Sequence, residues 1–437
     1  MLDKLQQHIA QQFPFLEGEK LLIAISGGLD SVVLTRLLQQ LNFNISLAHC
    51  NFNLRGNESD ADENFIKILG DKLEIPTFII GFDTDTYAKE KKLSTQLAAR
   101  ALRYDWFDKL AEKHSFDFVI TAHHADDNLE TFLINLSRGT GLEGLTGIPT
   151  INKNIVRPFL IFSRDEIEEY AVQNNIEWRE DQSNASTKYV RNKIRHQIVP
   201  VLKEINPNLL GSFLKTTEHL RQSQQIINDT IDAVKKEALE NSENEIVKIS
   251  ILEIKKLSNP KAYLFEILKE YGFTEWNDVL NLLEAQSGKH VFSKTHRLLK
   301  DRSFLFISKT NKNVQNIIYS IDENTSKITT PIHLTFEKVT EASAENKHTI
   351  FIDADTISFP LTLRKWQDGD FFYPKGIQGK KKISKFFKDE KHSLIDKDNT
   401  WLLCANNKII WVVDHRQDNR FTPQTNSSSI LKIKRLF

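Results

Sequence analysis

The stretch at residues 21–38 constrains the fold more than any other part of the chain. Five apolar residues, 21–25, run directly into Ser26-Gly27-Gly28-Leu29-Asp30-Ser31, and an apolar pattern of helical spacing follows. This order predicts a buried strand, a tight turn and the start of a helix. Neither glycine carries a Cβ atom, so the backbone can turn sharply there. A strand that leads into a helix in this way is typical of an α/β domain.

The same turn predicts a site for an anion. The first N–H groups of a helix have no acceptor within the helix, and the helix dipole favours negative charge, so a phosphate fits. The hydroxyls of Ser26 and Ser31 would add hydrogen bonds. Asp30 would repel a phosphate unless a divalent cation lay between them, which indicates Mg²⁺ held by Asp30. An ordinary glycine-rich turn, the alternative, would need neither the serines nor the aspartate.

The loop is not a Walker A motif, because Gly-x-x-x-x-Gly-Lys-Ser/Thr occurs nowhere in the chain. Ser-Gly-Gly-x-Asp-Ser instead resembles the loop of the ATP pyrophosphatase (PP-loop) superfamily, whose members bind the terminal phosphates of ATP and release pyrophosphate while they adenylate a substrate. The resemblance implies that ATP binds along the whole loop. The implied ATP-binding residues are Ser26, Gly27, Gly28, Leu29, Asp30 and Ser31.

Strand-like runs alternate with longer amphipathic segments through the first two hundred residues, at 44–49, 77–80 and 116–121. This alternation predicts an α/β domain with a doubly wound, mostly parallel sheet and with ligands at the carboxyl ends of its strands. Long charged helices follow, then a polar stretch, then strands mixed with one basic helix. We therefore expect a catalytic PP-loop domain at 1–200, a helical domain at 201–308, a linker with weak strands at 309–346 and a small α+β domain at 347–437.

Polar residues that suit nucleotide chemistry follow the predicted strands. Arg100 and Arg103, three apart on one predicted helix, share a face, and guanidinium groups suit phosphate oxygens. They would otherwise be solvated surface residues. His123 and Asp127, four apart after the strand at 116–121, would also share a helix face. A zinc site is the alternative for this pair, but no other His or Cys cluster supplies the remaining ligands.

Composition narrows the class of protein. With 40% hydrophobic and 27% charged residues the chain is typical of soluble globular proteins, and its apolar runs are shorter than a membrane span. We expect a cytoplasmic protein without membrane contact. Cys50 and Cys404 are isolated, so they provide neither a disulfide framework nor a zinc quartet. The 58 basic and 58 acidic residues cancel, so any contact with nucleic acid must come from a local cluster.

One local cluster of positive charge stands at residues 375–391, which are rich in lysine. Phe386 and Phe387 lie among the lysines and can anchor a helix while the lysines project, and Gly376 and Gly379 allow the backbone to approach a phosphate closely. The cluster is either a solvated surface or an RNA-binding surface. The candidate contacts are Lys380, Lys381, Lys382 and Lys385.

Together the motifs resemble the tRNA(Ile)-lysidine synthase family over most of the chain. The matching stretches are 26–31, 49–62, 99–100, 103–104, 121–124, 126–127, 157–160, Trp178, Asp181, Ser183-Asn184, 191–192, 363–364, 368–370, the lysine-rich run from Lys375 and 410–412. The resemblance implies ATP and Mg²⁺ as cofactors, and tRNA(Ile) with a CAU anticodon and free L-lysine as substrates.

Members of this family adenylate the wobble cytidine with ATP, release pyrophosphate, and then let the ε-amine of lysine displace AMP, so that the codon AUA is read instead of AUG. By motif, Asp30 would hold Mg²⁺ and Arg103 would offset charge as pyrophosphate leaves. His123 would contact phosphate or the activated base, and Asp127 would orient the metal or the lysine amine. These four are the predicted catalytic residues. The predicted tRNA contacts are Arg55, Arg191, Arg195, Lys380, Lys381, Lys382 and Lys385.

Three other functions fit part of the pattern. A tRNA thiolation enzyme of the same superfamily would share the loop, but it normally needs paired cysteines or an iron–sulfur cluster. A small-molecule adenylating amide ligase, such as an NAD or GMP synthetase, would leave the basic C-terminal cluster without a purpose. A non-catalytic ATP-binding or RNA-binding protein would not need the four predicted catalytic residues. The oligomeric state does not follow from the sequence.

Overall fold

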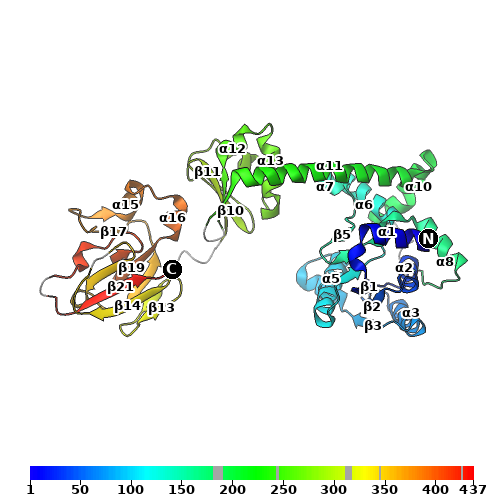
Figure 1. Ribbon diagram of the computed structural model, residues 1–437, viewed down its shortest axis with the longest axis horizontal. Coiled ribbons are helices and arrows are strands. Elements are labelled where there is room, and N and C mark those ends of the chain that lie inside the picture. The colour runs from blue at the N-terminus through cyan, green and yellow to red at the C-terminus, as the bar shows by residue number, and fades with distance from the viewer. Residues whose placement is uncertain (181–189, 243–245, 311–316, 344–345, 425–426) are drawn as a thin grey trace. The chain divides into compact units, whose positions relative to one another are not determined.

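The computed structural model describes residues 1–180, 190–242, 246–310, 317–343, 346–424 and 427–437 (Figure 1). Asp181, Ser183 and Asn184 of the family motifs lie outside these ranges. The chain divides into two compact units, Met1–Asn228 and Asp229–Phe437. Within the described ranges, no helix is long and apolar enough to cross a bilayer.

The first unit is built on a six-stranded sheet with the strand order β3-β2-β1-β4-β6-β5. Its strands are β1 (Lys20–Ala24), β2 (Asn44–Asn51), β3 (Thr77–Gly81), β4 (Phe118–Ile120), β5 (Ile151–Asn152) and β6 (Ile155–Val156). All neighbours pair in parallel except β5 with β6, which confirms the predicted fold class. The chain leaves β1 toward β2 on one side and returns to β4 on the other. Ligands of such sheets bind at this switch point, beyond the carboxyl ends of β1 and β4.

Helices cover both faces of this sheet. Leu21 and Ile23 of β1 pack in one apolar cluster with α2, whereas Leu22 between them packs in another with Phe107 and Leu110 of α5. Alternate residues of a strand point to opposite faces, so β1 is buried on both. The helices are α1 (Leu2–Gln12), α2 (Leu29–Gln40), α3 (Asn57–Leu73), α4 (Thr84–Lys91), α5 (Thr95–His114), α6 (Ala125–Arg138), α7 (Leu142–Leu145), α8 (Arg164–Gln173), α9 (Val190–Lys193) and α10 (Val199–Ile205).

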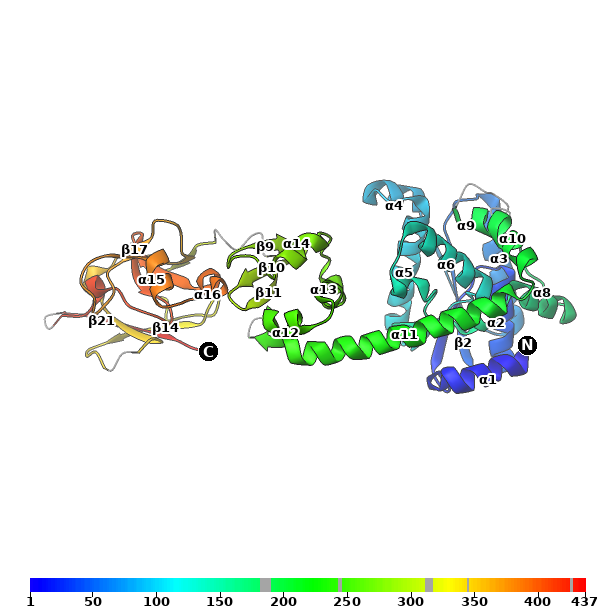
Figure 2. The ribbon, with the colours of Figure 1, turned by 90° about the horizontal axis from the view of Figure 1, so that it is seen from above.

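A π-helical segment, Ile194–Ile198, joins α9 to α10. Pro200 accounts for it, because proline has no N–H to donate to the carbonyl of His196. The long helix α11 (Leu209–Ala238) follows (Figure 2). Arg221 of α11 donates to the carbonyl oxygens of Thr146 and Ile148, which ties this part of the helix to the first unit.

The second unit begins with an antiparallel sheet of five strands in the order β7-β8-β11-β10-β9. Its strands are β7 (Leu239–Ser242), β8 (Ile246–Ser250), β9 (His290–Phe292), β10 (His296–Asp301) and β11 (Phe304–Lys309), and its helices are α12 (Ile251–Lys256), α13 (Pro260–Leu268) and α14 (Trp276–Asn281). β10 and β11 pair as an antiparallel hairpin. Sequence reasoning missed β7 and β8, because β7 follows directly on the long helix α11, β8 leads directly into α12, and neither short strand has an alternating pattern of its own.

The remainder of the second unit contains two four-stranded sheets, β12-β16-β19-β20 and β13-β14-β21-β15, and a small β17-β18 ladder. Their strands are β12 (Tyr319–Ile321), β13 (Lys327–Ile328), β14 (Leu334–Val339), β15 (Thr349–Asp353), β16 (Leu361–Lys365), β17 (Phe371–Phe372), β18 (Lys381–Lys382), β19 (Trp401–Ala405), β20 (Lys408–Val412) and β21 (Ile430–Arg435); the helices are α15 (Ile383–Asp389) and α16 (Leu394–Asn399). The segment at 309–346, which the sequence treats as a linker, contributes β12, β13 and β14. β12 pairs with β16 and β14 with β21, so these strands depend on partners distant in sequence.

Candidate active site

The glycine loop between β1 and α2 is braced by its own serines. Gly27 has a φ of +88°, which L side chains rarely adopt, and Gly28 is the N-cap of α2. Ser31 Oγ donates to the carbonyl of Gly28 at 3.0 Å and lies 3.2 Å from Ser26 Oγ. The first intrahelical bond runs from Val32 N–H to the carbonyl of Gly28. The N–H groups of the preceding helix residues therefore point into the loop, as a phosphate site requires.

Asp30 in this loop is held by Arg164. The guanidinium Nη1 lies 2.7 and 2.6 Å from the two carboxylate oxygens of Asp30, and the backbone N–H of Arg164 donates to Asp126 at 2.8 Å. One residue thus links the loop to α6. Sequence reasoning missed Arg164. The one signal for it is the capping box of Ser163 and Glu166, which fixes the start of α8 and places Arg164 in its first turn.

Three carboxylates lie around the side chain of His124, which follows β4. The side chain is 3% exposed, and its Nε2 lies 3.4 Å from Asp127 and 3.9 Å from Asp30, while Nδ1 lies 3.6 Å from Asp126. Burial alone would lower the pKa of His124, but Asp127, Asp126 and Asp30 outweigh burial and raise it. The predicted residues Asp30 and Asp127 therefore meet at a side chain to which the sequence assigned no role.

Asp127 and Glu130, one turn apart on α6, share the guanidinium of Arg195. Its Nη2 lies 3.2 Å from Asp127 and its Nε lies 2.6 Å from Glu130, which is 1% exposed. Arg191 donates to Thr131 at 2.8 Å and lies 3.6 Å from Glu130. Burial raises the pKa of Glu130 despite its bond to Arg195. Burial also opposes ionisation of Asp127, but the neighbouring cationic groups keep the pKa of Asp127 low. The sequence reading did not single out Glu130.

His123 has surroundings that differ from those of His124. Its Nδ1 lies 2.9 Å from Thr121 Oγ1. Burial lowers the pKa of His123 to about 4, and Arg157, Arg191 and Arg100 add to this effect while Asp127 opposes it. The imidazole is therefore neutral near pH 7 and can offer its second nitrogen to a ligand.

A cavity of about 730 Å³ opens beside the loop and is lined by Ser26, Phe52, Arg55 and Arg103 among others. Its volume falls in the range of small-ligand sites, roughly 300–1,000 Å³. The Arg103 guanidinium lies 5.2 Å from the centroid of the Phe52 ring. Arg55 is tied to Asp62 at 2.7 Å. The structure thus places two predicted arginines in one cavity with the first serine of the loop.

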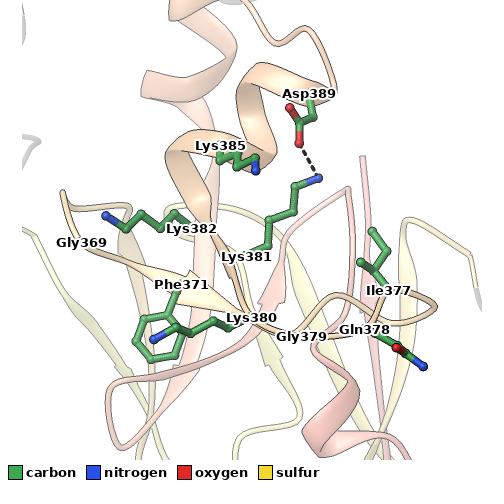
Figure 3. A pocket seen from close by; sticks show the side chains of 10 residues that line it. All are labelled: Gly369, Phe371, Ile377, Gln378, Gly379, Lys380, Lys381, Lys382, Lys385 and Asp389. Carbon is green, nitrogen blue, oxygen red and sulfur yellow. Dashed lines mark ion pairs between the residues drawn. The ribbon is translucent and has the colours of Figure 1, made fainter.

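The four predicted lysines line a separate hollow in the second unit (Figure 3). Lys381 lies 2.8 Å from Asp389, whereas Lys380 lies over the ring of Phe371, 5.2 Å from its centroid. Phe386 and Phe387 of α15 are buried and anchor the helix that carries Lys385. The structure therefore brings predicted site residues together in three places: Asp30 and Asp127 around His124, with Arg195 on Asp127; Arg55 and Arg103 in the cavity; and the four lysines in this hollow.

The carboxylates near the loop suit Mg²⁺ in their chemistry. Mg²⁺ prefers oxygen ligands and is usually bound by one or two carboxylates together with phosphate oxygens. Asp30 and Asp127 provide such oxygens. In the part of the chain that the structure describes, no group of three or more His, Cys, Asp or Glu side chains forms a metal site. The residues therefore fit a cation shared with a nucleotide rather than a closed zinc site.

This loop and sheet define an ATP-using enzyme of the PP-loop class. A family model for the PP-loop domain matches residues 1–202. Models for the TilS substrate binding domain and the TilS substrate C-terminal domain match residues 242–328 and 361–433.

Full-length relatives narrow the class to one family. The chain is 39% identical to the tRNA(Ile)-lysidine synthase of Parabacteroides distasonis over 437 residues, which cover 99% of both chains. It is also 39% identical to the enzyme of the same name from Bacteroides thetaiotaomicron over 418 residues, 95% of both chains, and 36% identical to that of Porphyromonas gingivalis over 440 residues, 96% of this chain and 95% of the relative. The chain belongs to the tRNA(Ile)-lysidine synthase family and is an ATP-dependent ligase, which confirms the family that its motifs predict.

Proposed function

We propose that this chain ligates free L-lysine to carbon 2 of the wobble cytidine in the CAU anticodon of tRNA(Ile). The product, lysidine, changes the codon that is read from AUG to AUA. The proposal rests on the full-length relatives named tRNA(Ile)-lysidine synthase. The meeting of Asp30, His124 and Asp127 beside the glycine loop supports it. We expect the reaction in the cytoplasm, where tRNA, ATP and free lysine occur together.

The first step is adenylation of the cytidine, in which the cytosine O2 attacks the α-phosphorus of ATP and pyrophosphate leaves. The loop residues Ser26, Gly27, Gly28, Leu29 and Ser31 would hold the leaving phosphates at the N-terminus of α2. Arg103 lines the same cavity as Ser26 and would offset the negative charge that develops as pyrophosphate leaves. His123 has Nδ1 engaged with Thr121, so its Nε2 would contact a phosphate oxygen or the base.

Asp30 would hold Mg²⁺, with Asp127 as the second candidate ligand. A bound Mg²⁺ would neutralise phosphate charge at this site. Arg164 engages both oxygens of Asp30, so it would have to give up part of this contact to a cation. Arg164 would then keep the remaining charge of Asp30 balanced.

The second step forms the new carbon–nitrogen bond. The ε-ammonium of lysine first loses a proton, the neutral amine attacks carbon 2, AMP leaves with the oxygen, and the new nitrogen loses a second proton. Asp127 and Glu130, which share Arg195, form a carboxylate pair that suits an ammonium group. Burial raises the pKa of Glu130, which makes Glu130 the better proton acceptor of the two. Lysine would take the place that Arg195 occupies between them.

The lysine-lined hollow and Arg55 would hold the tRNA. Lysine contacts to phosphates position a nucleic acid but carry no sequence information, so the hollow would position the tRNA rather than read it. Arg191 and Arg195 would contact tRNA only after leaving Glu130, since both lie against this carboxylate.

A labelled-lysine assay tests this function. The chain is incubated with ATP, Mg²⁺, labelled lysine and an unmodified tRNA(Ile) transcript with the CAU anticodon. We expect label in the anticodon, with AMP and pyrophosphate formed in equal amounts. A transcript with uridine at the wobble position is the matched control and should accept no label. Formation of ADP would contradict the proposal, because it would indicate γ-phosphoryl transfer.

A further inference from the structure

The lysine-lined hollow is built around a short β-ladder. Phe371 in β17 pairs with Lys382 in β18, and the connecting loop contains Gly376 and Gly379 with φ of +82° and +87°. The hollow has a volume of about 430 Å³, within the range of sites for small ligands. Figure 3 shows the lysine side chains on one side of it and Ile377 on the other. The ladder therefore carries a recess large enough for a single nucleotide.

Phe371 is exposed because it is not part of the neighbouring apolar core. Its strand neighbour Phe372 is fully buried with Phe386 and Phe387, whereas Phe371 is 42% exposed. Adjacent strand residues point to opposite faces, so the fold uses Phe372 for packing and leaves Phe371 in the hollow. Ile377, another residue of the hollow, is 43% exposed. The recess thus contains apolar surface that the fold does not cover.

The lysines of the hollow differ in how far their charge is balanced. Lys381 is paired with Asp389 at 2.8 Å, and its Nζ lies 5.7 Å from the centroid of Phe386. Lys380, Lys382 and Lys385 are exposed, and within the described ranges none of the three forms an ion pair with a carboxylate. Three lysines without a carboxylate partner therefore line the hollow together with an exposed aromatic ring, and one of them, Lys380, has its Nζ 5.2 Å from the centroid of that ring.

We propose that this hollow binds an unpaired nucleotide of RNA, with its base stacked on Phe371 and its phosphate held by Lys380, Lys382 and Lys385. Lysines alone would bind the phosphate backbone of a duplex equally well. The exposed ring favours a single strand, because bases within a duplex are already stacked on one another whereas an unpaired base can stack on an aromatic side chain. The inference rests on the proposed function only in that the RNA is tRNA.

Binding of a short RNA to the full-length chain tests this inference. The probe is a labelled ten-nucleotide single strand, compared with the same strand annealed to its complement, without ATP or lysine. We expect Phe371→Leu to weaken binding of the single strand by about 5- to 100-fold, the effect of losing one stacked base. Binding of the duplex should change by less than twofold. Phe371→Tyr should restore single-strand binding, because tyrosine keeps an aromatic face.

A matched control is available in the same unit. Phe437 is exposed and lies 5.3 Å from the guanidinium of Arg435, a similar pairing of ring and cation outside the hollow. Phe437→Leu should leave binding of both RNAs unchanged. Phe371→Leu should also keep the salt dependence of the wild-type chain, because it removes no phosphate contact.

The inference is wrong if Phe371→Leu binds the single strand as tightly as wild type, or if it loses duplex and single strand equally. The assay contains neither ATP nor lysine, so its outcome is independent of ligation. A chain that binds the single strand through Phe371 but incorporates no lysine would refute the proposed function and leave this inference intact. Thermal unfolding of each variant shows whether the fold is kept.

Discussion

The carboxylates Asp30, Asp126 and Asp127 near the glycine loop and the lysines of the hollow in the second unit differ in whether their charges are paired within the fold. At the loop each carboxylate has a cation from another element: Asp30 has Arg164, Asp126 has Lys203 at 3.3 Å, and Asp127 has Arg195. Among the lysines of the hollow, only Lys381 forms an ion pair with a carboxylate of the described residues. Side chains paired within the fold are held in position before a substrate arrives, which is what catalysis requires. Unbalanced cations instead gain their partners from a ligand, so they contribute affinity.

Removal of a paired carboxylate should have the largest effect. Asp30→Asn and Asp127→Asn keep the side-chain size but remove the charge that a cation or an ammonium group needs. We expect the rate of lysine incorporation to fall by roughly 10²- to 10⁴-fold in each variant. Incorporation of label and release of pyrophosphate are measured separately.

Asp165→Asn is the control for this pair. Asp165 also faces Lys203 in the same region, but its side chain is 80% exposed, and its loss should leave the rate unchanged. If both Asp30→Asn and Asp127→Asn release pyrophosphate at the wild-type rate, the metal and proton roles given above are wrong.

The unbalanced lysines should control tRNA affinity rather than chemistry. We expect the triple substitution of Lys380, Lys382 and Lys385 by Ala to weaken tRNA binding at physiological salt by about tenfold or more. The slope of log affinity against log salt should flatten by roughly 0.7–0.9 per lost phosphate contact. High tRNA concentration should restore most of the rate, and ATP binding should be unchanged.

Lys381→Ala tests whether a lysine that is already ion-paired contributes less to tRNA affinity than the other lysines of the hollow. Because Lys381 is already paired with Asp389, its loss should change affinity and salt slope less than loss of any of the other three lysines. Equal affinity and slope for the triple variant and wild type would show that the lysines form a solvated surface.

Substitution of Arg164 tests whether the cation that holds Asp30 in place contributes to the rate in addition to Asp30 itself. Arg164→Gln leaves Asp30 without its cation, and we expect kcat/KM to fall by about tenfold and the free energy of unfolding by about 1–2 kcal/mol. Arg164→Lys keeps the charge and should recover part of both losses. A glutamine variant as active as wild type would mean that Asp30 needs no such support.

The smallest effect concerns the neutral His123. Burial lowers its pKa from the usual value to about 4, so the unfolded chain binds a proton between pH 6.5 and 4 that the folded chain does not. Stability should therefore fall as pH drops through this window. His123→Gln should reduce the difference in unfolding free energy between pH 7 and pH 5 by about 2 kcal/mol. Urea unfolding at the two pH values measures it, and an unchanged difference would contradict a neutral His123.

Much of the first unit could be predicted because its signals are local. The strand, loop and helix at 21–38 can be predicted from consecutive residues. The alternation of strands and helices along the chain predicts the mostly parallel sheet. The ends of parallel strands meet at one edge, so Asp30 and Asp127 could be expected near each other before any coordinates were known. The motifs alone also identified the family, which the full-length relatives confirm.

Only the tertiary structure decided which cation faces which carboxylate. Arg164 and Asp30 are 134 residues apart, and Arg195 and Glu130 are 65 apart, so no local pattern links them. The same reason explains β12 and β14, whose weak patterns become strands only beside β16 and β21. A sequence of this kind determines local conformation and the choice of chemical groups. Packing of distant segments determines which charges are balanced and which are left for a ligand.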